Sequence, residues 1–233
     1  MLDTFLFDLD GTLLPIDMDK FLDIYFTELG AIFSDIIHPK LLVKNILAAT
    51  DAMINNTEFA TNESVFFKEF SSLIDTDIKL YTERFDSFYD NQYTKTKQAT
   101  YELPLINKCV NILKSKNYNI AVATNPLFPQ KAIYQRIAWA GLNIDAFSHI
   151  TSYEYSHYCK PKLEYYREVL DCLGKKPEQC MMVGNDVQED IIASKLGIKT
   201  FLITNNIINR DNEEICSTYI GTYEDFYAFV CNL

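Results

Sequence analysis

Two carboxylates separated by a single residue stand at the end of an apolar run near the N-terminus. The run is FLFDLDGTLLP, residues 5 to 15, and its acids are Asp8 and Asp10. Because side chains of a strand alternate with period two, both carboxylates point to the same side, and Gly11 then permits a tight turn. Two such charges repel unless a cation neutralises them, and an all-oxygen site suits Mg²⁺ better than zinc. The alternative is a strand that ends in an Asx-type turn without chemistry.

Polar and charged groups also follow two later apolar runs. Thr124 and Asn125 end the run YNIAVATN, and Asp186 follows the run CMMVG, with Asp190 four residues later. That step places the two acids on one face of a following helix, whose N-terminus favours negative charge. Lys160 lies in HYCKPKLEYY, directly before a proline. Taken singly, each group also suits a turn, a helix end or a solvated loop, so their order and placement must decide.

The elements that would position these groups alternate between strand and helix. Five apolar runs lack strict alternation and end in small or polar residues, as buried parallel strands do. They are residues 4–10, 118–125 and 180–186, with weaker candidates at 146–152 and 199–205. Helical patterns separate them, which predicts an α/β fold with a doubly wound, Rossmann-like parallel sheet. Ligands of such sheets bind beyond the carboxyl ends of the strands, where the groups described above fall.

The segment from residue 16 to 98 has a different character. It contains no convincing strand, and its apolar residues recur at intervals of three and four. Breakers divide it into about four helices: Pro39, the pair Asn55 and Asn56, and the stretch from Asp75 to Asp77. We therefore expect an all-helical cap domain over residues 16–98, inserted into an α/β core domain formed by residues 1–15 and 99–233.

Composition restricts the partners and the compartment. The 21 basic residues face 32 acidic ones, for a net charge of −11, so nucleic acid and anionic membranes would be repelled. No apolar stretch approaches the roughly 18 to 20 residues that span a bilayer. The six cysteines form no C-x-x-C pair and no signal peptide is apparent, which favours a reducing, cytoplasmic location. We expect neither a nucleic-acid nor a membrane partner, and a monomer is favoured.

The order of the polar groups resembles the motif pattern of the haloacid dehalogenase superfamily in its phosphatase branch. The pattern is D-x-D-G-T, then a strand-final Thr, then Lys-Pro, then G-x-D-x-x-x-D, and it covers the expected core. The helical insert after the first motif is similar in position to the family's helical cap. The resemblance implies a Mg²⁺-dependent phosphatase that hydrolyses a small phosphorylated metabolite, a phosphate monoester, through an aspartyl-phosphate intermediate.

The resemblance also implies roles for the acids. Asp8 is the expected nucleophile, and Asp10 is expected to protonate the leaving oxygen and then to deprotonate the attacking water. Asp8, Asp10 through its backbone carbonyl, and Asp186 are the expected Mg²⁺ ligands. Asn185 intervenes between glycine and the first acid of the fourth motif, where the family's commonest pattern has no residue. Whether Asp186 alone reaches the metal, or Asn185 with it, stays open.

Groups that hold the phosphoryl oxygens complete the expected site. Thr124, with backbone N–H groups around Asn125, is expected to bind a phosphoryl oxygen, and Lys160 to stabilise both the nucleophile and the transferring group. Asp190 is expected to position Lys160 or a metal-bound water. The metal and Lys160 would supply the local positive charge that an acidic protein needs to bind phosphate.

Two other interpretations stay open. A phosphomutase of the same superfamily shares every core motif, so the core alone does not separate it from a phosphatase. A non-catalytic, receiver-like binding module also combines a parallel sheet with clustered Asp, a Thr and a Lys. Its phosphorylated Asp, however, stands at the third strand, and it carries no long helical insert. Dehalogenation is disfavoured because the family's dehalogenases lack the second acid, here Asp10.

Overall fold

The structure is a computed structural model that describes residues 1–210 and 212–233. Within these residues six parallel strands form one sheet in the order β3-β2-β1-β4-β5-β6. The strands are β1 (Thr4–Phe7), β2 (Asn119–Val122), β3 (His149–Ile150), β4 (Cys180–Gly184), β5 (Lys199–Ile203) and β6 (Tyr219–Gly221). The predicted doubly wound parallel sheet is confirmed. Strand β6 is an addition, because the sequence pattern pointed to no strand beyond residue 205.

Strand β1 lies at the point where the strand order reverses, between β2 and β4. Its last residue, Phe7, is in register with Val122 of β2 and with Val183 of β4. The backbone N–H of Asp8 donates to the Val183 carbonyl at 2.9 Å, and that of Ala123 donates to the Phe7 carbonyl at 2.7 Å. The three strands therefore end at the same level, and the residues that follow them meet in one crevice.

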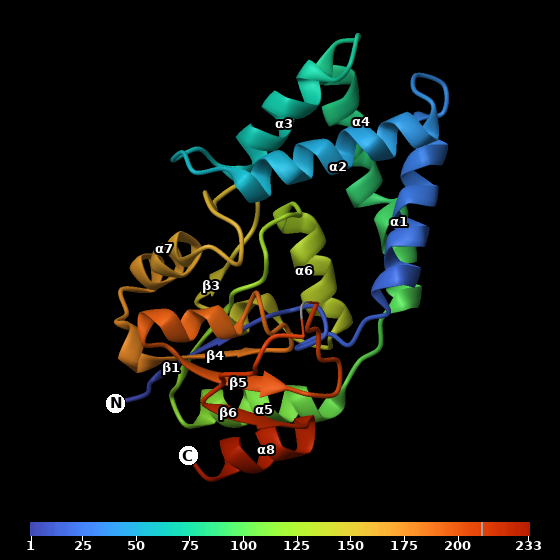
Figure 1. The fold of residues 1–233 in the computed structure, drawn as a ribbon. Coiled ribbons are helices and arrows are strands. Elements are labelled where there is room, and N and C mark those ends of the chain that lie inside the picture. The colour runs from blue at the N-terminus through green and yellow to red at the C-terminus, as the bar shows by residue number, and fades with distance from the viewer. Residues whose placement is uncertain (211) are drawn as a thin grey trace.

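Helices cover both faces of the sheet (Figure 1). Helices α5 (Pro104–Ser115) and α8 (Tyr223–Cys231) lie on one face, and α7 (Leu163–Leu173) and the 3₁₀ helix η4 (Ile191–Leu196) on the other. Alternate residues of β1 follow this division. Phe7 packs edge-on against Phe226 of α8, with ring centres 5.8 Å apart, whereas Leu6 belongs to the apolar cluster around Tyr166 of α7. The period of two thus buries β1 on both sides.

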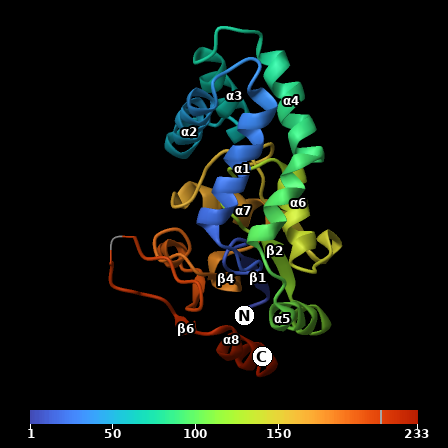
Figure 2. The same ribbon diagram turned by 90° about the vertical axis from the view of Figure 1, so that its right-hand side faces the viewer.

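Four helices follow the first strand and form what we call the helical layer: α1 (Met18–Phe33), α2 (Pro39–Asn55), α3 (Asn62–Ser72) and α4 (Ile78–Asp90). Figures 1 and 2 show them grouped at the end of the molecule opposite α8. Their starts are set locally, because the residue before each helix accepts a bond from a first-turn amide. These capping residues are Asp17, His38, Thr61 and Asp77. The division into cap and core domains at residues 16–98 stays a prediction.

Four further helices follow α4 or lie between the strands. They are α6 (Gln130–Trp139) and the short 3₁₀ helices η1 (Gln92–Ala99), η2 (Ile144–Ala146) and η3 (Pro177–Gln179). Helix α6 follows β2 and contacts both η1 and α4, so it joins the sheet to the helical layer. Among the described residues, no helix combines the length and the apolar character needed to cross a bilayer.

The segment after β4 differs from the expected helix. A helix was expected from Val187 onward, but residues 187–190 form turns and only η4 is helical. The physical reason is local: Asp186 Oδ1 accepts from the amides of Gln188 and Glu189, at 3.0 and 2.9 Å, while Asp190 Oδ2 accepts from the amide of Asp186. These side-chain acceptors compete with helical carbonyls for the backbone donors.

Candidate active site

Three charged side chains from distant segments meet in the interior at the ends of β1 and β4. Lys160, which precedes α7, donates from Nζ to Asp8 Oδ1 at 2.9 Å and to Asp190 Oδ1 at 2.6 Å. All three residues are buried. Asp8 follows β1 directly, and Asp190 is the residue before η4. The structure thus brings the expected nucleophile, the expected lysine and the acid expected to position that lysine into one hydrogen-bonded chain.

Burial and pairing oppose each other in this chain. Burial raises the pKa of Asp8 to about 6, although the charge of Lys160 pulls it down. Burial likewise raises the pKa of Asp190 to about 7 against the same lysine. Burial also disfavours the charge of Lys160. The carboxylates of Asp190 and Asp8 nevertheless hold the pKa of Lys160 well above its ordinary value. Lys160 is therefore a permanent cation, and its charge helps to keep the Asp8 carboxyl ionised at neutral pH.

Asp10 is paired with a residue that sequence reasoning missed. Its Oδ2 accepts a short hydrogen bond from Nη1 of Arg136, a side chain of α6 that is only 1% exposed. The guanidinium also lies over the Phe128 ring, 4.5 Å from its centre. Burial raises the pKa of Asp10, and Arg136 opposes the shift. One signal was available, because the helical spacing of QKAIYQRIAW places Arg136 on the same face as Ile133.

The pair leaves polar atoms without partners. Among the described residues, Asp10 Oδ1 and the Nε and Nη2 atoms of Arg136 are buried and make no hydrogen bond. Both residues line a cavity in front of the strand ends. Buried polar atoms of native proteins are normally satisfied, so these atoms mark a place where a ligand or water completes the structure.

Asp186 has its two carboxylate oxygens engaged in different ways. Oδ1 accepts the two backbone amides described above, whereas Oδ2 is paired with Arg210 at 2.6 Å. Arg210 also lies 3.6 Å from Glu189, and its side chain is 51% exposed. Burial raises the pKa of Glu189 to about 7, with Lys160 opposing the shift. Neither Arg210 nor Glu189 was among the expected site residues, because neither belongs to an apolar pattern or a motif position.

Asn185 braces the loop that follows β1. Its Oδ1 accepts from the Thr12 hydroxyl at 2.9 Å, and its Nδ2 donates to the Asn206 carbonyl at 2.7 Å. It packs so closely on Gly11 that a Cβ there would lie 2.5 Å from Asn185 Nδ2. Both ends of the Asn185 amide are therefore occupied within the protein, as are both carboxylate oxygens of Asp186.

Thr124 and Asn125 lie beside this cluster at the end of β2 and line the same cavity. The Thr124 carbonyl accepts from Thr151 Oγ1 at 2.7 Å and from the Tyr165 hydroxyl at 2.8 Å, which fixes the strand end. Asn125 Nδ2 donates to Glu189 at 3.2 Å. No described residue hydrogen-bonds to the Thr124 hydroxyl, so that hydroxyl is available to an oxygen in the cavity.

The oxygens expected to bind Mg²⁺ are of the right type for that ion. Neither Asp8 Oδ2 nor the Asp10 backbone carbonyl accepts a hydrogen bond from the described residues. The third expected ligand, Asp186, has its Oδ2 paired with Arg210. No group of three His, Cys, Asp or Glu side chains in the described chain is placed to hold a metal. The expected set, however, uses only two side chains and one carbonyl, and it fits the ion in donor chemistry.

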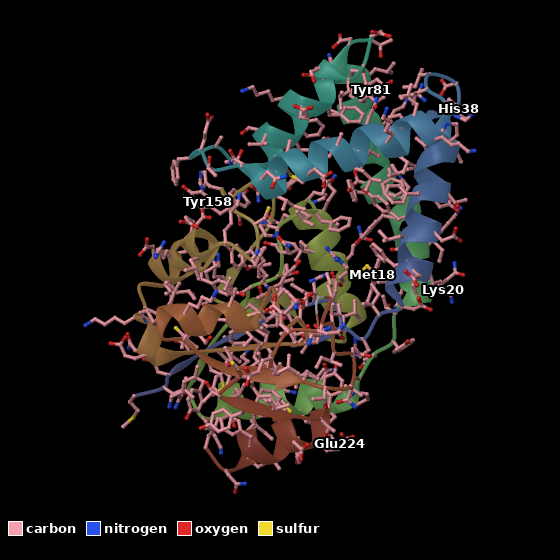
Figure 3. All side chains as sticks on the ribbon, in the orientation of Figure 1. Met18, Lys20, His38, Tyr81, Tyr158 and Glu224 are labelled. Atoms are coloured by element: carbon pink, nitrogen blue, oxygen red, sulfur yellow. The ribbon has the colours of Figure 1, made fainter. Side chains whose placement is uncertain are left out.

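The cavity in front of these groups has a volume of about 300 Å³. Asp8, Asp10, Thr124 and Asp186 lie on its sheet side, and residues of α1 to α4 line the opposite side. The other lining residues come from α6 and from the loops that follow the strands. Met18, labelled in Figure 3, lies at the start of α1, where the helical layer approaches the sheet, and is one of the lining residues. The cavity thus has three aspartates and a threonine at one end, and one of these aspartates, Asp8, is bonded to Lys160.

Comparison with known proteins identifies relatives by sequence. A family model described as haloacid dehalogenase-like hydrolase matches residues 2–197. A glyceraldehyde 3-phosphate phosphatase from Methanothermobacter thermautotrophicus is 26% identical over 104 residues, which are 44% of this chain and 45% of that protein. The chain thus spans less than half the length of this curated relative.

Solved structures share the fold across nearly the whole chain. A HAD phosphatase from Thermococcus onnurineus gives a TM-score of 0.61 at 17% identity and covers 98% of both chains. L-2-haloacid dehalogenase from Xanthobacter autotrophicus gives 0.60 at 16% identity, with full coverage of both. A predicted phosphoglycolate phosphatase from Haemophilus somnus gives 0.55 at 20% identity and covers 98% of this chain and 97% of its own. At these identities the likeness shows the fold alone.

Proposed function

This chain belongs to the haloacid dehalogenase-like hydrolases, and from that premise we propose that it is a Mg²⁺-dependent phosphatase of small phosphate monoesters. The observation that carries the proposal is the Asp8 carboxylate, which is bonded to a buried lysine and faces a cavity that Asp10 also lines. The partial relative named as a glyceraldehyde 3-phosphate phosphatase supports phosphate ester chemistry.

In the proposed reaction Asp8 attacks phosphorus, and the bond between phosphorus and the leaving oxygen breaks as Asp10 gives that oxygen its proton. Water then attacks the aspartyl phosphate, Asp10 takes a proton from that water, and inorganic phosphate leaves with the Asp8 carboxylate restored. Lys160 and the Thr124 hydroxyl stabilise the charge on the transferring oxygens. Mg²⁺ bound by Asp8, Asp10 and Asp186 would supply the charge that offsets repulsion between carboxylate and phosphate.

The second acid supports phosphate release over carbon–halogen cleavage, although dehalogenases share the fold. A leaving alkoxide is strongly basic and needs a proton, whereas a halide leaves without one. Asp10 provides a carboxyl whose pKa is raised by burial, so it can carry that proton nearer to neutral pH. A general acid two residues after the nucleophile has no use in halide displacement.

The proposal is tested by phosphate release from a panel of phosphorylated metabolites, including glyceraldehyde 3-phosphate, with Mg²⁺ and with a chelator. We expect Mg²⁺-dependent release that Asp8→Asn abolishes, with unchanged circular dichroism. Asp171→Asn, on the exposed face of α7, is the matched control and should retain full activity. Retained turnover in Asp8→Asn would contradict the proposal, and a rearranged sugar phosphate without free phosphate would identify a mutase instead.

A further inference from the structure

The cavity is divided by charge between its two sides. The charged residues that line it are Asp8, Asp10, Arg136, Asp186, Glu189, Asp190 and Arg210. All of them come from strand-end loops, α6 or the segment after β4. Of the described residues that α1 to α4 contribute, none is charged. The helical layer therefore presents an uncharged wall to whatever is attached to the reacting phosphate.

The polar atoms on that wall already have partners. The hydroxyls of Tyr25 and Tyr89 are hydrogen-bonded to each other at 2.8 Å. The Thr50 hydroxyl donates to the Ile46 carbonyl of its own helix at 2.9 Å. The other lining residues of α1 to α4 are Met, Leu, Ile and Phe. A polar substrate group would lose its hydrogen bonds to water and find few free partners on this wall. An apolar group has no such hydrogen bonds to lose, and the removal of its surface from water favours binding.

The two arginines of the cavity each have a carboxylate partner, and neither belongs to α1 to α4. Arg136 of α6 is paired with Asp10 through Nη1, while its Nε and Nη2 make no hydrogen bond among the described residues, and Arg210 is paired with Asp186 and Glu189. A second anionic group on a substrate part that is seated against α1 to α4 would therefore meet uncharged side chains, because none of the described lining residues of these helices is a cation. Burying a carboxylate without a partner is strongly unfavourable.

From these observations we propose that the preferred substrates are phosphate monoesters with an apolar, uncharged organic group, alkyl or aryl, seated against α1 to α4. The inference rests on the proposed phosphatase function, since the phosphate must lie at Asp8. A cavity of about 300 Å³ is at the lower end of the range for small-ligand sites, so the organic group is compact. Phosphorylated carboxylic acids and bisphosphates are poor substrates on this account.

The first test is a homologous series of substrates, from methyl to hexyl phosphate, with Mg²⁺ present. We expect kcat/KM to rise roughly fourfold with each added methylene until the cavity is filled. Phosphoglycolate matches ethyl phosphate in length but carries a carboxylate, and its kcat/KM should be lower by about tenfold or more. A flat series, or equal rates for phosphoglycolate and ethyl phosphate, would overturn the inference.

A matched pair of variants locates the effect in the cavity. Leu47 and Leu41 both belong to α2 and are 50% and 47% exposed, but only Leu47 lines the cavity. Because both positions reach solvent, either tolerates a lysine without burial of its charge. Leu47→Lys should lower the ratio of kcat/KM for ethyl phosphate to kcat/KM for phosphoglycolate by about tenfold, because the new ammonium attracts the carboxylate. Leu41→Lys should leave that preference unchanged, and an equal change in both variants would overturn the assignment.

A binding measurement distinguishes a wrong inference about the substrate from a wrong proposal about the reaction. If no ester releases phosphate with Mg²⁺, the proposed function has failed. Calorimetric titration with hexylphosphonate, methylphosphonate and phosphonoacetate then tests the cavity by itself. Tightest binding of hexylphosphonate supports an apolar site, and tightest binding of phosphonoacetate overturns it. Phosphate release from phosphoglycolate above all alkyl esters would keep the phosphatase and discard the apolar preference.

Discussion

At the scale of single residues, the ion pair between buried Arg136 and half-buried Asp10 is the least expected feature. Taking two charges out of water is costly, and the cost is offset here by their mutual attraction and by the ring of Phe128 over the guanidinium. Removal of one partner leaves the other as an uncompensated charge. The pair therefore couples the stability of this region to the protonation of the expected acid and base.

Arg136→Met should move the pH profile of kcat to higher pH. The charge of the guanidinium lowers the pKa of Asp10. Loss of the guanidinium therefore raises that pKa further, and the carboxyl ionises at a higher pH. The unfolding free energy, measured in urea, should fall by about 3 to 5 kcal/mol. Arg136→Met combined with Asp10→Asn, which removes both charges, should recover most of that loss. A double variant no more stable than Arg136→Met would show that the pair is not the cause.

Glu189 predicts a pH dependence of stability in the absence of metal. Its pKa lies at about 7 in the folded protein against an ordinary 4.5, so the folded state holds the proton longer than the unfolded state. Stability should therefore fall as pH rises from about 4.5 to 7 and then level off. Glu189→Gln should remove this part of the fall and be more stable than wild type by about 1 to 2 kcal/mol at pH 8, allowing for solvent screening.

Urea unfolding at pH 4 and pH 8 provides the measurement for Glu189. At pH 4 the variant and the wild-type protein should agree, because Glu189 is protonated in both the folded and the unfolded wild type. If the unfolding free energies of Glu189→Gln and wild type differed by the same amount at both pH values, the effect would come from packing and not from the charge of Glu189. Glu213→Gln, at an exposed position away from the cluster, is the control and should leave the pH dependence unaltered.

At the scale of elements, the junction between β4 and η4 fixes the position of the Lys160 side chain. Gly184 ends β4, and a Cβ there would lie 2.0 Å from Asp190 Oδ2. The glycine is needed for this close approach, because it lets Asp190 fold back under the strand end and accept from Lys160. The strand end and the following turn thus form one unit that positions the cation of the site.

Gly184→Ala should displace Asp190 and, through it, Lys160. A shift of about 1 Å in a positioned group can cost about 100-fold in turnover, which is the loss we expect in kcat. Gly174→Ala is a suitable control, because its left-handed φ of 61° makes it costly for stability while nothing lies within 4 Å of the added carbon. It should lose stability without loss of turnover. Unchanged kcat in Gly184→Ala would contradict the positioning role.

The elements also show what the sequence could predict. Helices α1 to α4 begin and end near their breakers, because apolar spacing and capping are local. The meeting of Asp8, Thr124 and Asp186 at one cavity was predictable because parallel strands end at a common edge. Lys160, 152 positions from Asp8, was expected there only through the resemblance to the family's order of motifs. The pairing of Arg136 with Asp10 could not be predicted from the sequence, because a helical pattern shows that a side chain faces inward but not which residue it contacts. The 3₁₀ form of η4 also depends on side-chain acceptors that no apolar pattern reveals.

At the scale of the whole molecule, the helical layer and the sheet are joined by two adjacent passages of the chain. The amide of Asp17 donates to the Ala99 carbonyl at 2.9 Å, and that of Tyr101 donates to the Pro15 carbonyl at 3.1 Å. The cavity lies between the parts that these passages connect, because its lining residues come both from α1 to α4 and from the loops at the strand ends. In our proposals, the reaction belongs to the sheet side of the cavity, and the choice of organic group belongs to the helical layer.

The central claim is that Asp8 accepts the phosphoryl group, and mass spectrometry tests it most directly. An ester that the enzyme turns over is mixed with Mg²⁺ and the Asp10→Asn variant, in which breakdown of the intermediate should be slow, and the reaction is quenched in acid. We predict that the peptide containing Asp8 gains the mass of one phosphoryl group, and that Asp8→Asn shows no gain. Steady phosphate release with no phosphoryl group on Asp8, or with one on another residue, would contradict the account.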